Sequence, residues 1–213
     1  MDNRQIENLR QTYESPTLSL SDIHMDPLRQ FSSWFEDALD AELSEPNAFS
    51  LATVSKDGQP SNRIVLFKGL KEGFIFYTNY KSQKGRNLAE NPKASACFFW
   101  QGLHRQVRIE GICKKLNAEQ SDDYFNKRPL GSRIGAITSP QSEEIDSREW
   151  LQMMWEANAA ELGNHPSRPE YWGGYELIPH RIEFWQGQPS RLHDRFVYEK
   201  TEKGAWSIKR VAP

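Results

Sequence analysis

The sequence predicts an α+β fold made mainly of antiparallel strands, about six to eight in a barrel or sheet, with helices packed outside. Between residues 49 and 116 apolar and polar residues mostly alternate, and the turn signals KDGQP and LKEG separate the runs. Helix-start signals dominate residues 117–163, and strand patterns return from residue 174. No repeat or change of composition divides the chain. We therefore expect an N-terminal arm over residues 1–20 and one domain over residues 21–213.

A first helix is expected directly after the arm, in DPLRQFSSWFEDALDAEL. Asp26 can cap this helix, and Pro27 fits its first position, where the missing N–H has no intrahelical partner. The apolar residues predicted to share one helical face are Leu28, Phe31, Phe35, Leu39 and Leu43.

Capping residues also mark the later helices. Ser82 can cap a short helix that runs as far as Leu88. Asn117 with Gln120 forms a capping-box pattern before a helix, and Asp146 with Glu149 is predicted to repeat it.

The expected strands are short and separated by turn residues. TEKG is predicted to be a tight turn between the last two of them. The stretches predicted as strands are FSLATVS, SNRIVLFKG, FIFYTNY, ASACFFW and HRQVRIEGICKKL, followed by residues 174–184, 192–200 and 205–211.

Composition excludes several function classes. The formal net charge is −2, with basic and acidic residues interspersed, which argues against a nucleic-acid partner. Neither a signal-peptide pattern nor a run of about 20 apolar residues occurs, so no membrane segment is expected. Cys97 and Cys113 lie in apolar strand-like runs and favour buried free thiols in a reducing compartment, with the cytoplasm as default.

Common site motifs are also missing. The chain has no G-x-G-x-x-G, Walker A, H-E-x-x-H or G-x-S-x-G pattern. Its five histidines are widely spaced and have no cysteine neighbours, so no metal site is expected. Binding must then come from cations and polar groups at strand ends.

The first cluster of candidate site residues is RIVLFK, residues 63–68. In a strand, successive side chains face opposite sides of the sheet. The two faces are therefore predicted to carry Arg63, Val65 and Phe67 on one side and Ile64, Leu66 and Lys68 on the other. The cations either border solvent at the strand end or hold an anionic ligand at the rim of the sheet, and spacing alone leaves both interpretations open.

A second cluster, YTNYKSQK, takes a strand into a capped helix. Free amides at a helix N-terminus, with Lys81 and Lys84 beside them, suit a phosphate. A serine cap followed by lysines is also common on ordinary protein surfaces.

A third cluster is YFNKRPLGS, in which Tyr124, Arg128 and Ser132 recur every four residues. Tyr124 and Arg128 are predicted to share one helical face, and Pro129 ends that helix so that Ser132 begins the next. A phenol, a guanidinium and a helix-start hydroxyl can all donate to a phosphate. The alternative is a solvated helix end.

The fourth cluster, RLHDR, is predicted to extend a strand. Arg191, His193 and Arg195 would then share one face, where three adjacent donors repel one another unless an anion lies over them. This favours a ligand site. Trp185, six residues earlier, offers a flat surface for a planar ring, with core packing as the alternative.

Together these stretches resemble the pyridoxine (pyridoxamine) 5'-phosphate oxidase family. The resemblance rests on RIVLFK, FYTNYKSQKG, HRQVRIEG, YFNKRPLGSRIGA, SPQS, YWGGY, IEFWQG, RLHDR and the terminal W-x-I-x-R-x-A-P, in order from about residue 8 to the C-terminus. It implies a homodimeric FMN-binding split β-barrel with FMN at the subunit interface. The implied reaction oxidises pyridoxine or pyridoxamine 5'-phosphate to pyridoxal 5'-phosphate by hydride transfer from C4' to flavin N5, with O2 as acceptor and H2O2 as product.

The resemblance also implies site residues. The implied FMN contacts are Arg63, Ile64, Val65, Leu66, Phe67, Lys68, Tyr77, Thr78, Gln83, Lys84, Gln106, Gln141, Ser142, Trp185 and Arg195. The implied substrate contacts are Arg10, Tyr13, Lys68, Tyr124, Arg128, Ser132, Arg191, Leu192 and His193. Arg191 and His193 would hold the pyridine ring, and Arg195 would stabilise negative charge at the flavin pyrimidine edge.

One position departs from the family pattern. Gln83 stands where the family often has a second cation beside Lys84, so neutralisation of the FMN phosphate is expected to be weaker or to come from Lys81. Two other functions remain open from the residues: another split-barrel flavin reductase, or a non-catalytic pyridoxal phosphate-binding protein.

Overall fold

The structure is a computed structural model that describes residues 3–9 and 12–213. The chain divides into two compact units, each assembled from separate segments. The first comprises Met1–Pro46, Cys97–Glu110 and His180–Pro213, and the second comprises Asn47–Ala96 and Gly111–Pro179. Three long strands contribute residues to both units, so sequence order alone does not separate them.

Within the described residues the strands form a nine-stranded sheet, in which the order of hydrogen-bonded neighbours is β2-β1-β5-β6-β7-β4-β3, and β8 pairs with β7 and with β9. The pairs β1–β2, β3–β4, β4–β7, β7–β8 and β8–β9 are all antiparallel. The strands are β1 (Ala48–Val54), β2 (Pro60–Leu66), β3 (Gly69–Leu70), β4 (Phe74–Asn79), β5 (Lys93–Trp100), β6 (Arg105–Lys115), β7 (Trp172–Gln186), β8 (Asp194–Lys200) and β9 (Trp206–Arg210).

The second unit places a capped helix at the end of β4. Helix α3 (Gln83–Glu90) follows β4 after three residues, and the Ser82 hydroxyl accepts the Gly85 amide as its cap, as predicted. Gly85 packs so closely on the preceding turn that a Cβ atom there would lie 2.2 Å from the Tyr80 carbonyl oxygen. This contact fixes the start of α3, and with it Lys84, against the strand end.

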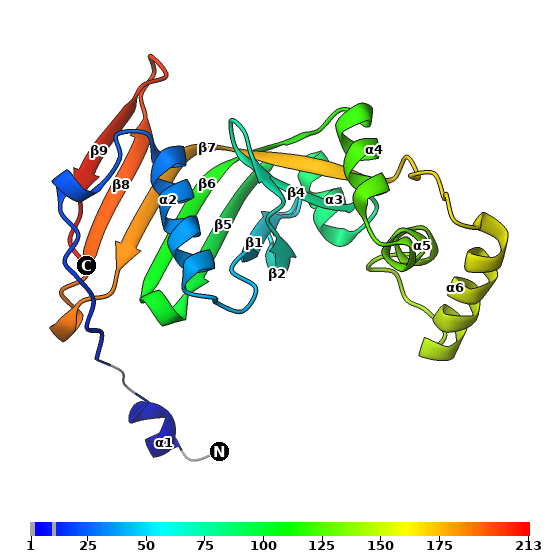
Figure 1. Cartoon of the computed structure of the whole chain (residues 1–213), viewed down its shortest axis with the longest axis horizontal. Coiled ribbons are helices and arrows are strands. Elements are labelled where there is room, and N and C mark those ends of the chain that lie inside the picture. Colours follow the sequence, from blue (N-terminus) through cyan, green and yellow to red (C-terminus); the bar gives the residue numbers. More distant parts are fainter. Residues whose placement is uncertain (1–2, 10–11) are drawn as a thin grey trace. The chain divides into compact units, whose positions relative to one another are not determined.

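Three further helices belong to the second unit. They are α4 (Ala118–Lys127), α5 (Leu130–Thr138) and α6 (Arg148–Leu162), and Figure 1 shows α5 and α6 side by side. The capping box of Asn117 and Gln120 is present, as predicted. The predicted Asp146 cap is wrong, because the Ser147 hydroxyl accepts the Trp150 amide and α6 starts one residue later.

The first unit packs α2 (Pro27–Asp40) through aromatic residues. The side chain of Asp26 accepts the Leu28 amide and Pro27 holds the first position, as predicted. The buried face differs from the predicted one, since Leu39 is 51% exposed whereas Trp34 and Ala38 are buried. Trp34 packs edge-on against Phe184 of β7, with ring centroids 5.2 Å apart. The first unit also contains a short helix α1 (Asn3–Glu7) and the β8–β9 hairpin, coloured orange to red in Figure 1.

Both cysteines, half-buried Cys97 and buried Cys113, are free thiols. No helix in the described part of the chain has both the length and the apolar character needed to cross a membrane. Among residues 3–9 and 12–213, no group of three or more histidine, cysteine, aspartate or glutamate side chains is placed to hold a metal ion.

Candidate active site

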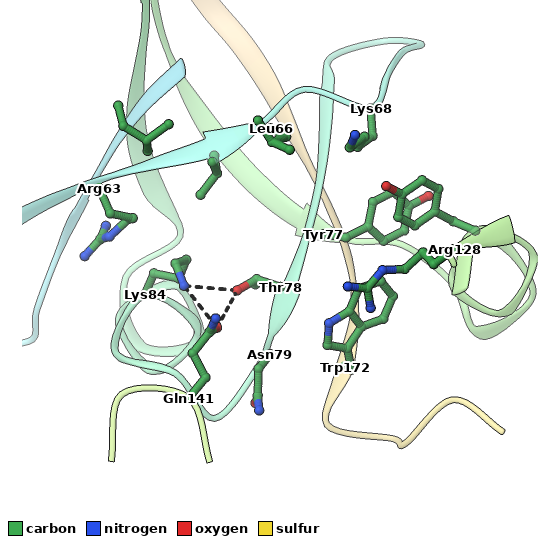
Figure 2. A pocket seen from close by; sticks show the side chains of 13 residues that line it. Arg63, Leu66, Lys68, Tyr77, Thr78, Asn79, Lys84, Arg128, Gln141 and Trp172 are labelled. Carbon is green, nitrogen blue, oxygen red and sulfur yellow. Dashed lines mark hydrogen bonds between the residues drawn. The ribbon is translucent and has the colours of Figure 1, made fainter. Parts of the chain in front are cut away.

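A cavity of about 310 Å³ lies in the second unit, where β2, β4 and the start of β7 meet side chains from α3 and from the end of α4 (Figure 2). We call it the β2–β4 cavity. Four of its lining side chains are cationic, and no carboxylate is among the lining residues that the structure describes. It is lined by Arg63, Ile64, Val65, Leu66, Lys68, Tyr77, Thr78, Asn79, Lys84, Tyr124, Arg128, Gln141 and Trp172.

Residues from both faces of β2 line the cavity, although their exposure alternates along the strand. The predicted alternation of β2 is confirmed: Ile64 is 66% exposed, whereas Arg63 and Val65 are half-buried and Phe67 is buried. The Arg63 guanidinium donates from Nη1 to the Leu51 carbonyl (3.1 Å) and Thr53 Oγ1 (2.7 Å). Burial lowers its pKa. Its hydrogen-bond partners among the described residues are all neutral, so no carboxylate there cancels its charge.

Lys84 lies in the first turn of α3 and is only 9% exposed. Its Nζ donates to Thr78 Oγ1 and Gln141 Oε1, both at 3.2 Å (Figure 2). It also donates to Ser82 Oγ at 3.3 Å. Burial, with a smaller contribution from Arg63, lowers the pKa of Lys84 to about 8. A buried ammonium with only neutral acceptors is a site for an anion, because a negative charge restores the solvation that burial removes.

Three stacked rings line another part of the β2–β4 cavity. The Tyr77 and Tyr124 rings lie 3.8 Å apart at 14°, and the Trp172 ring is nearly parallel to both. Burial, with smaller contributions from Tyr124 and other neighbours, raises the pKa of Tyr77 to about 12, so its phenol keeps its proton.

Arg128 stands over this stack. Its guanidinium carbon lies 4.5 Å from the Trp172 ring centroid (Figure 2), and its buried Nη1 has no hydrogen-bond partner among the described residues. Burial lowers its pKa. The predicted helical face is wrong here, because α4 ends at Lys127 and Arg128 has extended dihedral angles (φ −73°, ψ 147°).

Ser132 shares a cavity with Arg128 but not with Tyr124. It sits in the first turn of α5, where its amide donates to the Pro129 carbonyl at 2.9 Å. It lines a second cavity of about 290 Å³ that shares Asn79, Arg128, Gln141 and Trp172 with the β2–β4 cavity. Arg128 thus borders both spaces, while Tyr124 lines the first and Ser132 the second.

The first unit has its own cavity, of about 380 Å³, at the mouth of the β7–β8 hairpin. We call it the β7–β8 cavity. It is lined by Leu9, Thr12, Tyr13, Trp185, Gln188, Ser190, Arg191 and His193. Tyr13 of the arm packs its ring 5.7 Å from Trp185 and 5.8 Å from His193.

His193 has a defined tautomer. Its Nδ1 accepts the Gln188 amide at 3.0 Å, which leaves the proton of the neutral ring on Nε2. Burial first, and then the charges of Arg191 and Arg195, lower its pKa. The neutral ring, 4.6 Å from Trp185, can therefore donate a hydrogen bond through Nε2.

The predicted common strand face of Arg191, His193 and Arg195 is wrong. Strand β8 begins at Asp194, and Arg191 lies in a 3-10 turn with a positive φ of 62°. Arg191 and His193 line the β7–β8 cavity, whereas Arg195 is absent from the described lining residues. Arg195 instead donates from Nε to Glu183 at 3.0 Å. Its charge is thus balanced by a carboxylate.

Hydrogen bonds hold the arm in place on the C-terminal side of Tyr13. The Leu18 amide donates to Asp194 at 2.9 Å, and Arg210 bridges Asp194 and the Leu18 carbonyl. The Gln188 side chain also donates to the Pro16 carbonyl at 2.9 Å. These bonds hold the arm segment that places Tyr13 beside Trp185.

Several predicted residues lie elsewhere. Arg10 is outside the described residues. Gln83 and Leu192 are exposed, and Gln106 is half-buried on β6. Phe67, Gln83, Gln106, Ser142, Leu192 and Arg195 are absent from the described linings of the three cavities.

The structure adds two residues to the predicted set, Asn79 and Trp172, which both line the β2–β4 cavity and its neighbour. Their signals in the sequence are the YTN and YWGGY stretches. Asn79 and Trp172 are paired in the register of β4 and β7, which no local pattern reveals.

The antiparallel sheet, its cation-lined cavity and the comparisons with known proteins identify the chain as a split-barrel protein of the FMN-binding class. Residues 35–158 match the family model described as pyridoxamine 5'-phosphate oxidase, and residues 172–213 match the pyridoxine 5'-phosphate oxidase C-terminal dimerisation region. The chain belongs to the pyridoxine/pyridoxamine 5'-phosphate oxidase family and is an enzyme.

Curated relatives agree over almost the whole length. Proteins named pyridoxine/pyridoxamine 5'-phosphate oxidase from Burkholderia lata and Paraburkholderia phytofirmans are 53% and 52% identical, over 98% of this chain and 99% of theirs.

Solved structures give the same fold. PhzG from Burkholderia lata 383, in complex with tetrahydrophenazine-1-carboxylic acid, superposes with a TM-score of 0.88 at 31% identity, covering 93% of this chain and 99% of its own. A pyridoxamine 5'-phosphate oxidase-related, FMN-binding protein from Nostoc punctiforme gives 0.73 at 19% identity, covering 90% and 100%, which shows the fold alone.

Proposed function

We propose that the protein is an FMN-dependent oxidase that converts pyridoxine 5'-phosphate or pyridoxamine 5'-phosphate to pyridoxal 5'-phosphate, with O2 as acceptor and H2O2 as product. With pyridoxamine 5'-phosphate, water is also consumed and the amine nitrogen leaves as ammonia. The observation that carries the proposal is the β2–β4 cavity. Its four cations lack a carboxylate partner among the described residues, and the buried Nη1 of Arg128 lacks any partner there. Such a cavity suits phosphate monoesters, which carry a charge of about −1.5 to −2 near neutral pH.

Arg63 and Lys84 fit the phosphate of FMN. Both are held by neutral oxygens, so no carboxylate among the described residues competes with a ligand for them. Thr78 and Gln141 add a hydroxyl and an amide, so charge and hydrogen-bonding capacity are both supplied. The remaining proposed FMN contacts are Ile64, Val65, Leu66, Phe67, Lys68, Tyr77, Gln83, Gln106, Ser142, Trp185 and Arg195.

The chemistry that FMN supplies when bound is to accept two electrons from C4' of the substrate and deliver them to O2, which leaves as H2O2. The residues of this chain bind, orient and shield the reactants. Arg195, fixed by Glu183, supplies a positive charge that does not have to reorient during the reaction.

The phosphate of the substrate is assigned to Lys68, Tyr124, Arg128 and Ser132. The Tyr124 phenol and the Arg128 guanidinium line the β2–β4 cavity. Ser132 lines the neighbouring cavity, which Arg128 also borders. These groups give charge-assisted hydrogen bonds of the kind that place a phosphate firmly.

The pyridine ring is assigned to residues of the β7–β8 cavity. Because FMN is proposed to lie at the interface of the homodimer, groups from both subunits are proposed to complete one site. Arg191 and His193 bind its polar groups, with His193 donating through Nε2. Tyr13 covers the bound ring from the arm, and Arg10 and Leu192 complete the proposed substrate set. These residues hold C4' in a reactive position, and a small displacement of C4' would slow the reaction strongly.

The C-terminal region that matches a dimerisation region supports a homodimer. Two free cysteines support the cytoplasm, where thiols stay reduced.

The test is a visible spectrum of the purified protein before and after anaerobic addition of pyridoxamine 5'-phosphate. We expect a yellow protein that bleaches and then, in air, releases pyridoxal 5'-phosphate and H2O2. A colourless protein that cannot be loaded with FMN would refute the proposal. Tight pyridoxal 5'-phosphate binding without O2 consumption would instead indicate a binding protein. Binding of tetrahydrophenazine-1-carboxylic acid in place of the phosphate ester would instead indicate a ligand like that of PhzG.

A further inference from the structure

We propose that Trp172 is a positioning residue, which holds the Arg128 guanidinium in the orientation that binds the substrate phosphate while leaving its N–H donors free. The inference rests on the proposed function and assigns a role to a residue that the sequence patterns did not single out. It depends on how Arg128 is supported, how Trp172 is fixed, and what a ring provides that a carboxylate cannot.

Arg128 has little support of its own. It follows the last residue of α4, and its extended backbone takes it out of the helix. Its side chain must nevertheless be held in one conformation before it can bind, which costs conformational entropy. Within residues 3–9 and 12–213, no carboxylate forms an ion pair with it, and Nη1 is buried without a partner. Another group must hold it.

Trp172 is rigidly placed to do so. It is 6% exposed and is the first residue of β7, paired with Asn79 of β4. Its backbone N–H donates to Pro169 at 3.0 Å, and its carbonyl accepts from Arg168 at 2.6 Å. Its ring lies within 4° of the plane of the Tyr124 ring and packs edge-on against Phe125. The ring face under the guanidinium is therefore fixed by sheet and helix together.

An aromatic face has one advantage over a carboxylate in this position. A guanidinium 4.5 Å above a ring centroid is attracted by the negative face of the π system, and the attraction uses none of its five N–H donors. A carboxylate would accept two of those donors and cancel the charge that the phosphate needs. Trp172 thus orients Arg128 and leaves it able to bind an anion.

The experiment is a double-mutant cycle between Trp172→Leu and Arg128→Ala in FMN-loaded protein, with the dissociation constant of pyridoxamine 5'-phosphate as readout. Loss of a desolvated cation–π contact should weaken binding about tenfold in Trp172→Leu. KM should rise by a similar factor, with kcat and FMN content nearly unchanged. In the Arg128→Ala background the same substitution should cost less than about twofold, because no guanidinium remains to be positioned.

Two variants keep the test decisive if Trp172→Leu folds poorly. Trp172→Phe retains an aromatic face and should bind within about threefold of the wild type. Trp150→Leu removes a tryptophan of α6, outside the described linings of the three cavities, and should leave binding unchanged.

Equal losses from Trp172→Leu in the presence and absence of Arg128, or a fall in kcat with KM unchanged, would overturn the role. Failure of the proposed function looks different: the wild-type protein would neither bind nor oxidise pyridoxamine 5'-phosphate. Binding without oxidation would still allow the cycle to be measured.

Discussion

Arg128 and Arg195 are both half-buried arginines of the predicted substrate and cofactor sets, yet they have opposite kinds of neighbour. Arg128 of the second unit lies on the Trp172 ring and has a donor without a partner among the described residues. Arg195 of the first unit donates to buried Glu183 and to the Ala212 carbonyl. The first keeps its hydrogen-bonding capacity for a ligand, while most of the second's capacity is used within the fold.

The same difference separates other cations of the β2–β4 cavity from the arginines on the strands of the first unit. In the β2–β4 cavity, Arg63 and Lys84 contact only hydroxyls, an amide oxygen and a carbonyl. In the first unit, carboxylates pair with arginines on β6, β7, β8 and β9. Those arginines are Arg105, Arg108, Arg181, Arg195 and Arg210. The contrast teaches that the partner of a cation, rather than its burial, decides how much of its hydrogen-bonding capacity remains for a ligand.

Replacing Glu183 is expected to have the largest effect. It tests whether the arginines that pair with carboxylates stabilise the fold. Glu183 is 1% exposed and pairs with Arg108, Arg181 and Arg195. Glu183→Gln leaves these charges without their common partner, and breaking a buried ion pair costs about 3 kcal/mol. Thermal unfolding should show a Tm lower by roughly 6–12 °C.

Lys209→Met is the matched control for Glu183→Gln. It removes an exposed ion pair with Glu199 on the β8–β9 hairpin and should shift Tm by no more than roughly 2–4 °C. Equal shifts from the two variants would show that the carboxylate at 183 does not anchor these arginines.

The pH dependence of FMN binding tests the role of the cations in the β2–β4 cavity. The expected change in FMN affinity is intermediate in size. Burial lowers the Lys84 pKa to about 8, so its ammonium loses its proton as the pH rises through that value, whereas the phosphate stays doubly charged above about pH 7. FMN affinity should therefore fall, by up to roughly tenfold between about pH 7 and about pH 9. Quenching of FMN fluorescence measures this directly.

Lys84→Arg is the control, because a guanidinium keeps its charge over this range and the pH dependence should vanish.

The stability of the FMN-free wild-type protein should depend on pH in the opposite sense. The folded-state pKa is below the unfolded value of 10.5, so the unfolded chain binds more protons between pH 8 and 10.5, and the free energy of unfolding rises with pH there. A flat FMN-binding profile in the wild type would contradict a role for Lys84 in holding the phosphate.

The smallest effect is expected for Asp194→Asn, which tests whether a carboxylate of the first unit holds the arm in place. Asp194 holds both the Leu18 amide and Arg210, so losing its charge should weaken the attachment of the arm by about 1 kcal/mol. Hydrogen exchange at Leu18 should become roughly fivefold faster, with exchange in β4 unchanged. Asp22→Asn, which alters an exposed cap nearby, is the control and should leave Leu18 as it is. Exchange that is unaffected by Asp194→Asn would mean that other contacts hold the arm.

Features set by neighbouring residues were predictable from the sequence. Asp26 caps α2, Ser82 caps α3, and the β2 residues alternate, because each depends on backbone geometry within a few positions. Asp146 and Ser147 show the limit of this reasoning. Both side chains can cap a helix, and only the path of the preceding chain decides that Ser147 does so.

Features set by distant residues were not predictable in this way. Alternation through RLHDR assumes an extended chain, but Ser190 and Arg191 have positive φ angles and the strand starts only at Asp194. The partner of Arg195 is a diagonal neighbour on β7, Glu183, which depends on strand register. The pairing that brings Trp172 to the β2–β4 cavity depends on register in the same way.

Gly85 carries no functional group, yet the start of α3 depends on it. Any other residue would drive its Cβ atom into the Tyr80 carbonyl, push the helix away from the strand and swing the neighbouring lysine out of reach of Thr78. In a saturation library selected for flavin retention, this position should therefore tolerate only its native residue. A search for functional residues that considered only reactive or charged side chains would overlook Gly85.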